Sequence, residues 1–385
     1  MASISDIPAE LILHVFECAG FDRPTLKTCS LVCKSWTPIA YSHLFRSASW
    51  TARMLEPVPH QPAPSCFIHI EDMTIYFPRL TPETLQNAGI CMKKLVNVRM
   101  LHVNHPQFSD LDQPKLSVLS ESFSGIVFLD ITLGRITDLP RFIEFICSFP
   151  NLETLRLQHI LLRQETPPYA YTGSSRMPLS FHTLETAVGG PVAQIVAQWF
   201  MSHEPRLPLV TIKMEFLEEP IISLIRSMPT TLQALHCNIW DPLPEELPCE
   251  FGLQSFVSLQ SIRLMLPVFE SQQRYPSSRI ISGIIAGITP STPLQDVMLG
   301  FNLMTPRRPL EAIRLNEVAD WPAIDRIFGA QHFPTLKTIT LKLVHFGSTD
   351  LRLSLESTLR DFLPHCDSRG VLRIDIKDTH TYVPK

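Results

Sequence analysis

The stretch Asn151-Leu-Glu-Thr-Leu-Arg-Leu-Gln158 decides the fold, because apolar and polar side chains alternate along it. Leu152, Leu155 and Leu157 are the apolar positions, and polar side chains such as Arg156 lie between them. Successive side chains of a β-strand point to opposite faces of a sheet. This period of two therefore predicts a strand with one buried face and one solvated face.

The same spacing of apolar residues, a gap of two and then a gap of one, recurs along the chain. Clear copies are Leu209/Ile212/Met214, Leu232/Leu235/Cys237, Leu259/Ile262/Leu264, Leu294/Val297/Leu299 and Leu336/Ile339/Leu341. Weaker copies are Leu95/Val98/Met100 and Ile126/Leu129/Ile131, and a degenerate copy begins at Leu184. The helices predicted between the strands span residues 140–149, 191–203, 220–228, 279–288 and 323–328.

This spacing resembles the L-x-x-L-x-L core of leucine-rich repeats. The resemblance implies an α/β solenoid, with parallel strands on its concave face and helices on its convex face. The repeats are irregular, because 23 residues separate Leu209 from Leu232 but 42 separate Leu294 from Leu336. The longer repeats must carry insertions, which we place at residues 161–179, 267–279 and 305–322.

Three short helices are predicted in the first fifty residues. The first has Pro8 in its first turn and stops at Gly20, the second begins at Pro24 and runs through Val32, and the third begins at Ser35. A unit of about 40 residues rarely buries its apolar side chains without a partner. Another protein or the next domain must therefore cover part of this surface.

Two strings in this region, Ile7-Pro-Ala-Glu-Leu-Ile-Leu-His-Val-Phe16 and Cys29-Ser-Leu-Val-Cys-Lys-Ser-Trp36, resemble the F-box, as does His43-Leu-Phe-Arg46. Ile7 stands where the family favours Leu. The whole chain resembles fungal-type F-box proteins with leucine-rich repeats. The F-box resemblance implies docking onto the Skp-type adaptor of an SCF ligase through Pro8, Leu11, Ile12, Phe16, Leu31, Val32, Lys34 and Trp36. The alternative is a small helical cap that only closes the core of the larger domain.

The domain organisation follows from these patterns. We expect a three-helix F-box at residues 1–50 and a substrate-binding domain of leucine-rich-repeat type at residues 67–385. Residues 51–66 contain four prolines and are predicted to form a stiff, extended linker.

The composition excludes several functional classes. Of the 385 residues, 45% are hydrophobic and 18% are charged, the net charge is −4, and no cluster of Lys and Arg suggests a nucleic-acid partner. No apolar run approaches the ~20 residues that span a membrane, and the N-terminus does not resemble a signal peptide. The nine cysteines lack paired CxxC spacing, which fits reduced thiols in the cytoplasm or nucleus.

No pattern indicates an enzyme or a cofactor. The phosphate-binding glycine loop, the G-x-S-x-G elbow and the H-E-x-x-H zinc helix are all missing. His102 and His105 have the spacing of a metal pair, but a third ligand is not near in sequence, so a loop is the favoured interpretation. Cys29 and Cys33 are interpreted as structural.

The function expected from these resemblances is that of a non-catalytic substrate-recognition subunit of an SCF-type ubiquitin ligase. Alternatives are a scaffold or sequestering protein not linked to degradation, or an enzyme built on the repeats. The protein substrate should contact outward strand positions and one insertion, at Arg156, Tyr169, Tyr171, Lys213, His236 and Arg263. These side chains could instead form the solvated face that any such strand has.

Overall fold

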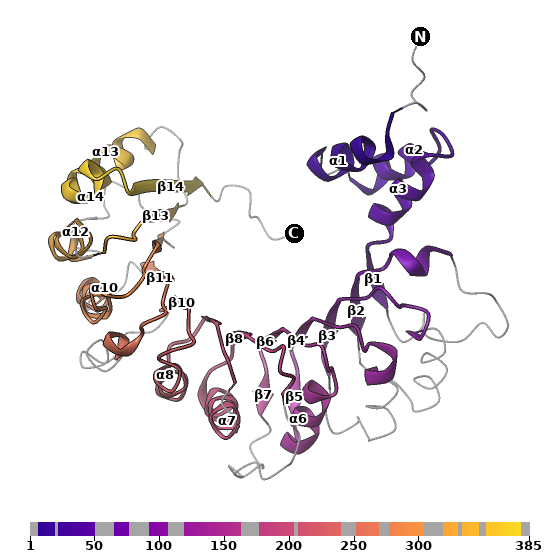
Figure 1. The fold of residues 1–385 in the computed structure, drawn as a ribbon, viewed down its shortest axis with the longest axis horizontal. Coiled ribbons are helices and arrows are strands. Elements are labelled where there is room, and N and C mark those ends of the chain that lie inside the picture. The colour runs from indigo at the N-terminus through magenta and orange to yellow at the C-terminus, as the bar shows by residue number, and fades with distance from the viewer. Residues whose placement is uncertain are drawn as a thin grey trace. The chain divides into compact units, whose positions relative to one another are not determined.

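The computed structural model describes residues 7–19, 22–50, 65–76, 92–106, 119–162, 177–203, 207–239, 252–268, 277–303, 319–329, 333–345 and 352–378. The chain divides into two compact units, unit 1 (Met1–Phe181) and unit 2 (His182–Lys385). Figure 1 traces the helices and strands of both units in chain order. Among the described residues, no helix has the length and apolar character needed to cross a bilayer.

Unit 1 begins with the three predicted helices, α1 (Ala9–Ala19), α2 (Arg23–Cys29) and α3 (Trp36–Leu44). The carboxylate of Asp22 caps α2 by accepting a hydrogen bond of 2.9 Å from the amide of Thr25. The second helix is shorter than predicted, because it ends at Cys29 and residues 30–35 form turns instead.

These helices enclose a small core of their own. Its buried members, none more than 8% exposed, are Ile12, Phe16, Leu26, Ala40 and Leu44. Four further side chains, partly buried, pack against them: Cys29, Trp36, Ile39 and Phe45. The ring of Trp36 meets that of Phe16 edge to face, with 5.8 Å between centroids.

Unit 1 continues as a sheet of parallel strands. Their order is β1 (Ser47–Trp50), β2 (Asp72–Tyr76), β3 (Met100–Asn104), β4 (Phe128–Thr132) and β6 (Thr154–Gln158). The connections contain the 3-10 helix η3 (Ser65–His69), the helix α6 (Leu139–Cys147) and a two-stranded parallel pair, β5 (Arg135–Ile136) with β7 (Leu161–Leu162). The amides of Glu71 and Asp72 donate to the carbonyl of Arg46, which joins the start of β2 to the residue before β1.

Unit 2 repeats the strand-and-helix alternation. Its parallel strands are β8 (Thr183–Ala187), β9 (Thr211–Met214), β10 (Ala234–Asn238), β11 (Ser261–Val268), β12 (Asp296–Leu303), β13 (Thr338–His345) and β14 (Leu372–Asp378). Its helices are α7 (Gly190–Met201), α8 (Glu219–Arg226), η5 (Leu253–Ser255), α10 (Ser277–Ala286), α12 (Trp321–Gly329), α13 (Arg352–Phe362) and α14 (Pro364–Ser368). Figure 1 shows the helices of unit 2 on one side of its strands, which confirms the predicted α/β class with a parallel sheet.

Burial along the strands follows the predicted alternation. In β6, Leu155 and Leu157 are fully buried, whereas Arg156 and Gln158 are partly exposed. Polar side chains just before a strand also tie neighbouring repeats together. Asn151 donates to the carbonyl of Ser124, 27 residues earlier, and Ser258 donates to the carbonyl of Thr230, 28 residues earlier. Each such bond satisfies a carbonyl in the turn of the preceding repeat.

Two of the weaker sequence copies are placed differently in the structure. The copy assigned to Leu95, Val98 and Met100 is wrong by three residues, because Val98, Leu101 and Val103 are buried and Met100 is 37% exposed. The degenerate copy begins at buried Phe181, before Leu184 of β8. The strands β1, β2 and β14 were not predicted from the sequence.

Most of the predicted insertions and linker lie outside the described residues. These segments are 51–64 of the linker, and 163–176, 269–276 and 305–318 of the insertions. Residues 47–50, within the range predicted for the F-box, form β1 and pair with β2. The predicted domain boundaries otherwise stay a prediction.

Candidate functional site

An exposed apolar surface on the helical part of unit 1 is the first candidate site. Leu11 is 58% exposed, Val15 53%, Val32 47% and Leu31 85%. Leu11 and Val15 are one turn apart on α1, and Leu31 and Val32 lie in the turns after α2. We call these four residues the apolar docking surface. Large apolar side chains exposed on an otherwise folded unit are candidates for contact with a partner.

Hydrogen bonds hold the turns that present Leu31 and Val32. The amide of Leu31 donates to the carbonyl of Thr28, and the amide of Val32 donates to the carbonyl of Cys29. The hydroxyl of Thr37, on α3, donates to the carbonyl of Ser30 over 2.7 Å. The turns are therefore fastened at both ends, and their apolar side chains are left facing solvent.

The predicted adaptor-contact residues fall into two groups. Pro8, Leu11, Leu31, Val32 and Lys34 are exposed. Ile12 and Phe16, 3% and 2% exposed, lie in the three-helix core, and Trp36 is partly buried against it. Ile12 and Phe16 cannot contact a partner without unfolding this core, so we assign them a supporting role.

A thiol lies beside the apolar docking surface. The Sγ of Cys33 is 3.0 Å from the hydroxyl of Ser35, and this hydrogen bond lowers the pKa of the Cys33 thiol. Cys29 is partly buried against the helical core. The packing of Cys29 fits the structural role expected from the sequence, and the role of Cys33 stays a prediction.

A polar cluster on the outward strand face of unit 1 is the second candidate site. The pairing of β2, β3, β4 and β6 sets Thr74, His102, Asp130 and Arg156 side by side. Nδ1 of His102 is 3.0 Å from Oδ2 of Asp130, and its Nε2 is 3.3 Å from Oδ1 of Asp72.

The carboxylate of Asp130 is the centre of this cluster, although it lies on the outward face. Its side chain is only 9% exposed, because His102 and Arg156 cover it. The hydroxyl of Thr132 donates to it over 3.1 Å, and Arg156 lies over the ring of Phe128 at 5.0 Å. A buried charge is tolerated only with such partners.

The pKa of His102 is raised. The hydrogen bond with Asp130 is the main cause and burial opposes it, while the charges of Asp72 and Asp130 favour the imidazolium and that of Arg156 disfavours it. A protonated His102 between two carboxylates, with Arg156 nearby, gives a cluster with balanced charge. The sequence contained a signal for this cluster, since its members occupy equivalent positions in successive repeats.

The outward strand face of unit 2 carries the other predicted substrate contacts. The strand register sets Lys213 beside His236 and His236 beside Arg263. Lys213 forms an ion pair with Glu185 of β8. Burial, with the charges of Arg263 and Lys213, lowers the pKa of His236 to about 4, so its imidazole is neutral at pH 7.

The remaining predicted contacts are Arg156, Tyr169 and Tyr171. Arg156 belongs to unit 1, and Tyr169 and Tyr171 lie outside the described residues. The loop predicted around His102 and His105 is wrong, because His102 lies within β3 and only His105 follows the strand, with a backbone φ of 54°. Within the described ranges, no group of three or more His, Cys, Asp or Glu side chains could hold a metal ion.

Comparison with known proteins identifies the helical region. Residues 4–49 match the F-box-like family, and these residues form an F-box-like domain. A leucine-rich-repeat protein of Leptospira interrogans aligns structurally with 87% of this chain and 91% of its own, at 12% identity and a TM-score of 0.23, too low to carry an argument. The search of curated proteins finds no match.

The His102 cluster predicts a specific titration. In the folded chain, His102 should titrate above about 6.5, the ordinary value for histidine, and Asp130→Asn should lower its pKa because the main acceptor loses its charge. Because the pKa of His102 is raised in the folded state, the cluster contributes its full stabilisation at pH below the His102 pKa of the unfolded chain. This contribution is lost as the pH rises through the His102 pKa of the folded chain. NMR of the His102 ring protons measures the titration.

The matched control for this titration is Asp138→Asn, which removes a carboxylate outside the cluster, where it caps α6. It should leave the His102 pKa unchanged. A wild-type His102 that titrates at or below the ordinary value would contradict the description of the cluster.

Proposed function

We propose that this chain is the substrate-recognition subunit of an SCF-type (Skp–cullin–F-box) ubiquitin ligase. The observation that carries the proposal is the apolar docking surface on the F-box-like domain. F-box domains generally bind Skp-type adaptors, and the exposed leucines of this one supply the surface such a partner would cover. The chain would act in the cytoplasm or nucleus.

The chain supplies binding and no chemistry in this proposal. A substrate held on the strand face would be kept near the ubiquitin-carrying enzyme of the ligase. Tethering raises the effective concentration of an acceptor lysine without any new catalytic group. Polar strand faces such as the Lys213–His236–Arg263 row offer cationic and hydrogen-bonding groups that suit a protein surface.

Truncating the apolar docking surface should abolish adaptor binding. Each fully buried leucine contributes roughly 1.5–3 kcal/mol, so the double variant Leu11→Ala, Leu31→Ala should weaken binding by about 100-fold or more. Both side chains are exposed, and the fold should therefore survive, as circular dichroism can verify. Affinity for a purified Skp-type adaptor is the measurement.

Leu179→Ala is the control, because Leu179 is 88% exposed but lies in unit 1 outside the F-box-like domain. It should bind the adaptor like the wild type. The proposal is wrong if the folded double variant keeps wild-type affinity. Adaptor binding without recruitment of cullin would favour the scaffold alternative.

Replacing Lys213, His236 and Arg263 by Ala should reduce capture of the substrate but not of the adaptor. Affinity purification with the proteasome blocked is done in parallel with the full chain and with a chain lacking residues 1–46. Proteins captured by both chains are those that bind without the F-box. Gln194→Ala with Gln198→Ala is the control on the exposed side of α7, and should change nothing. An equal loss of substrate capture from the strand-face substitutions and from the α7 substitutions would exclude the strand face as the recognition surface.

A further inference from the structure

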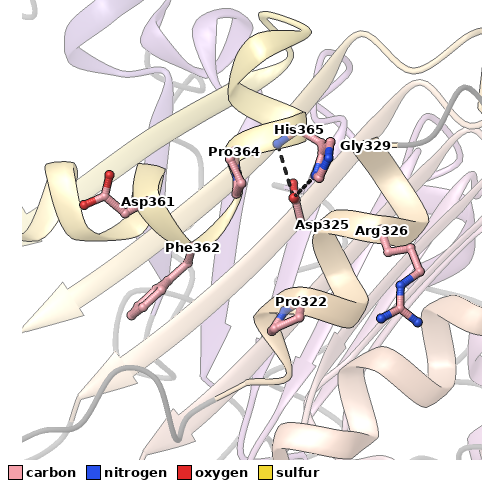
Figure 2. A pocket seen from close by; sticks show the side chains of 8 residues that line it. All are labelled: Pro322, Asp325, Arg326, Gly329, Asp361, Phe362, Pro364 and His365. Carbon is pink, nitrogen blue, oxygen red and sulfur yellow. Dashed lines mark hydrogen bonds and ion pairs between the residues drawn. The ribbon is translucent and has the colours of Figure 1, made fainter.

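A cavity of about 540 Å³ lies between α12 and the junction of α13 with α14 in unit 2 (Figure 2). Pro322, Arg326 and Gly329 recur at helical spacing along the α12 side, so they share one face of that helix. The other side is formed by Asp361, Phe362, Pro364 and His365. The volume is within the range of about 300–1,000 Å³ that small-molecule sites occupy.

His365 is held in one position in this cavity. The buried Asp325 accepts hydrogen bonds from Nδ1 of His365 at 2.6 Å and from the amide of Cys366 at 3.0 Å (Figure 2 draws the His365 contacts). A Cβ on Gly329 would lie 2.4 Å from the Cβ of His365, so only glycine permits this approach.

The tautomer of His365 follows from the state of Asp325. Burial opposes ionisation of Asp325, but hydrogen bonds from Cys366 and His365 outweigh it and lower the pKa of the carboxyl. An ionised carboxylate can only accept, so Nδ1 of His365 donates. The side chain of His365 is 75% exposed. In the neutral imidazole, Nε2 is then the acceptor and is available to a ligand N–H.

The remaining lining residues give the cavity one cation, one anion and apolar walls. Neither Arg326 nor Asp361 has an ion-pair partner in the described part of the chain. Phe362 stacks on Trp321, with 5.5 Å between ring centroids and 13° between planes. Together with Pro322 and the proline at position 364, it forms the apolar part of the lining.

We propose that this cavity binds a small organic monocarboxylate that carries an apolar group and an N–H donor. The guanidinium of Arg326 pairs with the carboxylate, which matches its planar fork of donors. Phe362 and the two prolines cover the apolar group, and Nε2 of His365 accepts from the N–H. Asp361 repels a second negative charge, so a phosphate dianion is disfavoured. This site does not depend on adaptor docking.

Hippurate, N-benzoylglycine, is the probe, since it combines a carboxylate, an N–H and a phenyl ring. Titration of the full chain, followed by calorimetry or ligand-observed NMR, should show saturable binding with a Kd on the order of 1 mM. Arg326→Gln should weaken binding at least about tenfold. Arg373→Gln removes an exposed arginine of β14 outside the cavity and should leave the affinity unchanged.

Two further comparisons separate the contacts. His365→Asn keeps a donor near the Nδ1 position but lacks Nε2, so it should weaken hippurate and not 3-phenylpropionate, which has no N–H. The wild type should bind phenyl phosphate more weakly than it binds hippurate. Asp361→Asn should reduce this difference in affinity between the two ligands. The proposal is overturned if hippurate shows no saturable binding up to about ten times the expected Kd, if Arg326→Gln binds like the wild type, or if phenyl phosphate binds more tightly.

Discussion

Backbone pairing between parallel strands is the interaction on which the repeat architecture depends. Because the strands pair in register, a residue of one repeat lies beside its equivalent in the next, as Leu129 does beside Leu155. The same pairing sets Asp130 beside Arg156, one residue further on and on the opposite face. A slip of one residue would exchange the two faces and bury the charges. The core and the polar strand face are therefore fixed together.

The sequence predicts this architecture well where the apolar spacing includes leucine and fits a single register, and poorly elsewhere. The Leu152 copy and the five clear copies after it correspond to strands with buried inward positions. The copy at Leu95 was misplaced because Leu95 and Val98 are themselves buried before the strand, so the spacing fits two registers. The strand β2 also carries the spacing, at the buried residues Ile70, Met73 and Ile75, but none of the three is a leucine and two acidic residues lie between the first two. Side-chain pattern cannot separate such strands from irregular apolar segments without knowledge of the neighbouring strand.

In the candidate site, too, the sequence pattern does not tell which single side chains are buried and which are exposed. The F-box strings contain the core-facing Ile12 and Phe16 and the exposed Leu11 and Val15, as two pairs spaced one helical turn apart. Both pairs are apolar, so the sequence alone does not tell which one faces the core. Packing against α3, with Phe16 contacting Trp36, decides it. Likewise, the partners of Asp130 on neighbouring strands lie 28 residues before it, at His102, and 26 residues after it, at Arg156, and only the repeat register brings them together.

In the proposed function, the F-box-like domain is the docking end of the chain and the strand faces are left for a second partner. Hydrogen–deuterium exchange of the full chain, with and without a Skp-type adaptor, tests this division most directly. The adaptor should slow exchange in α1 and at the amides of residues 30–35, with no change in the strands of unit 2. Protection confined to the strands, or no protection at all, would contradict it.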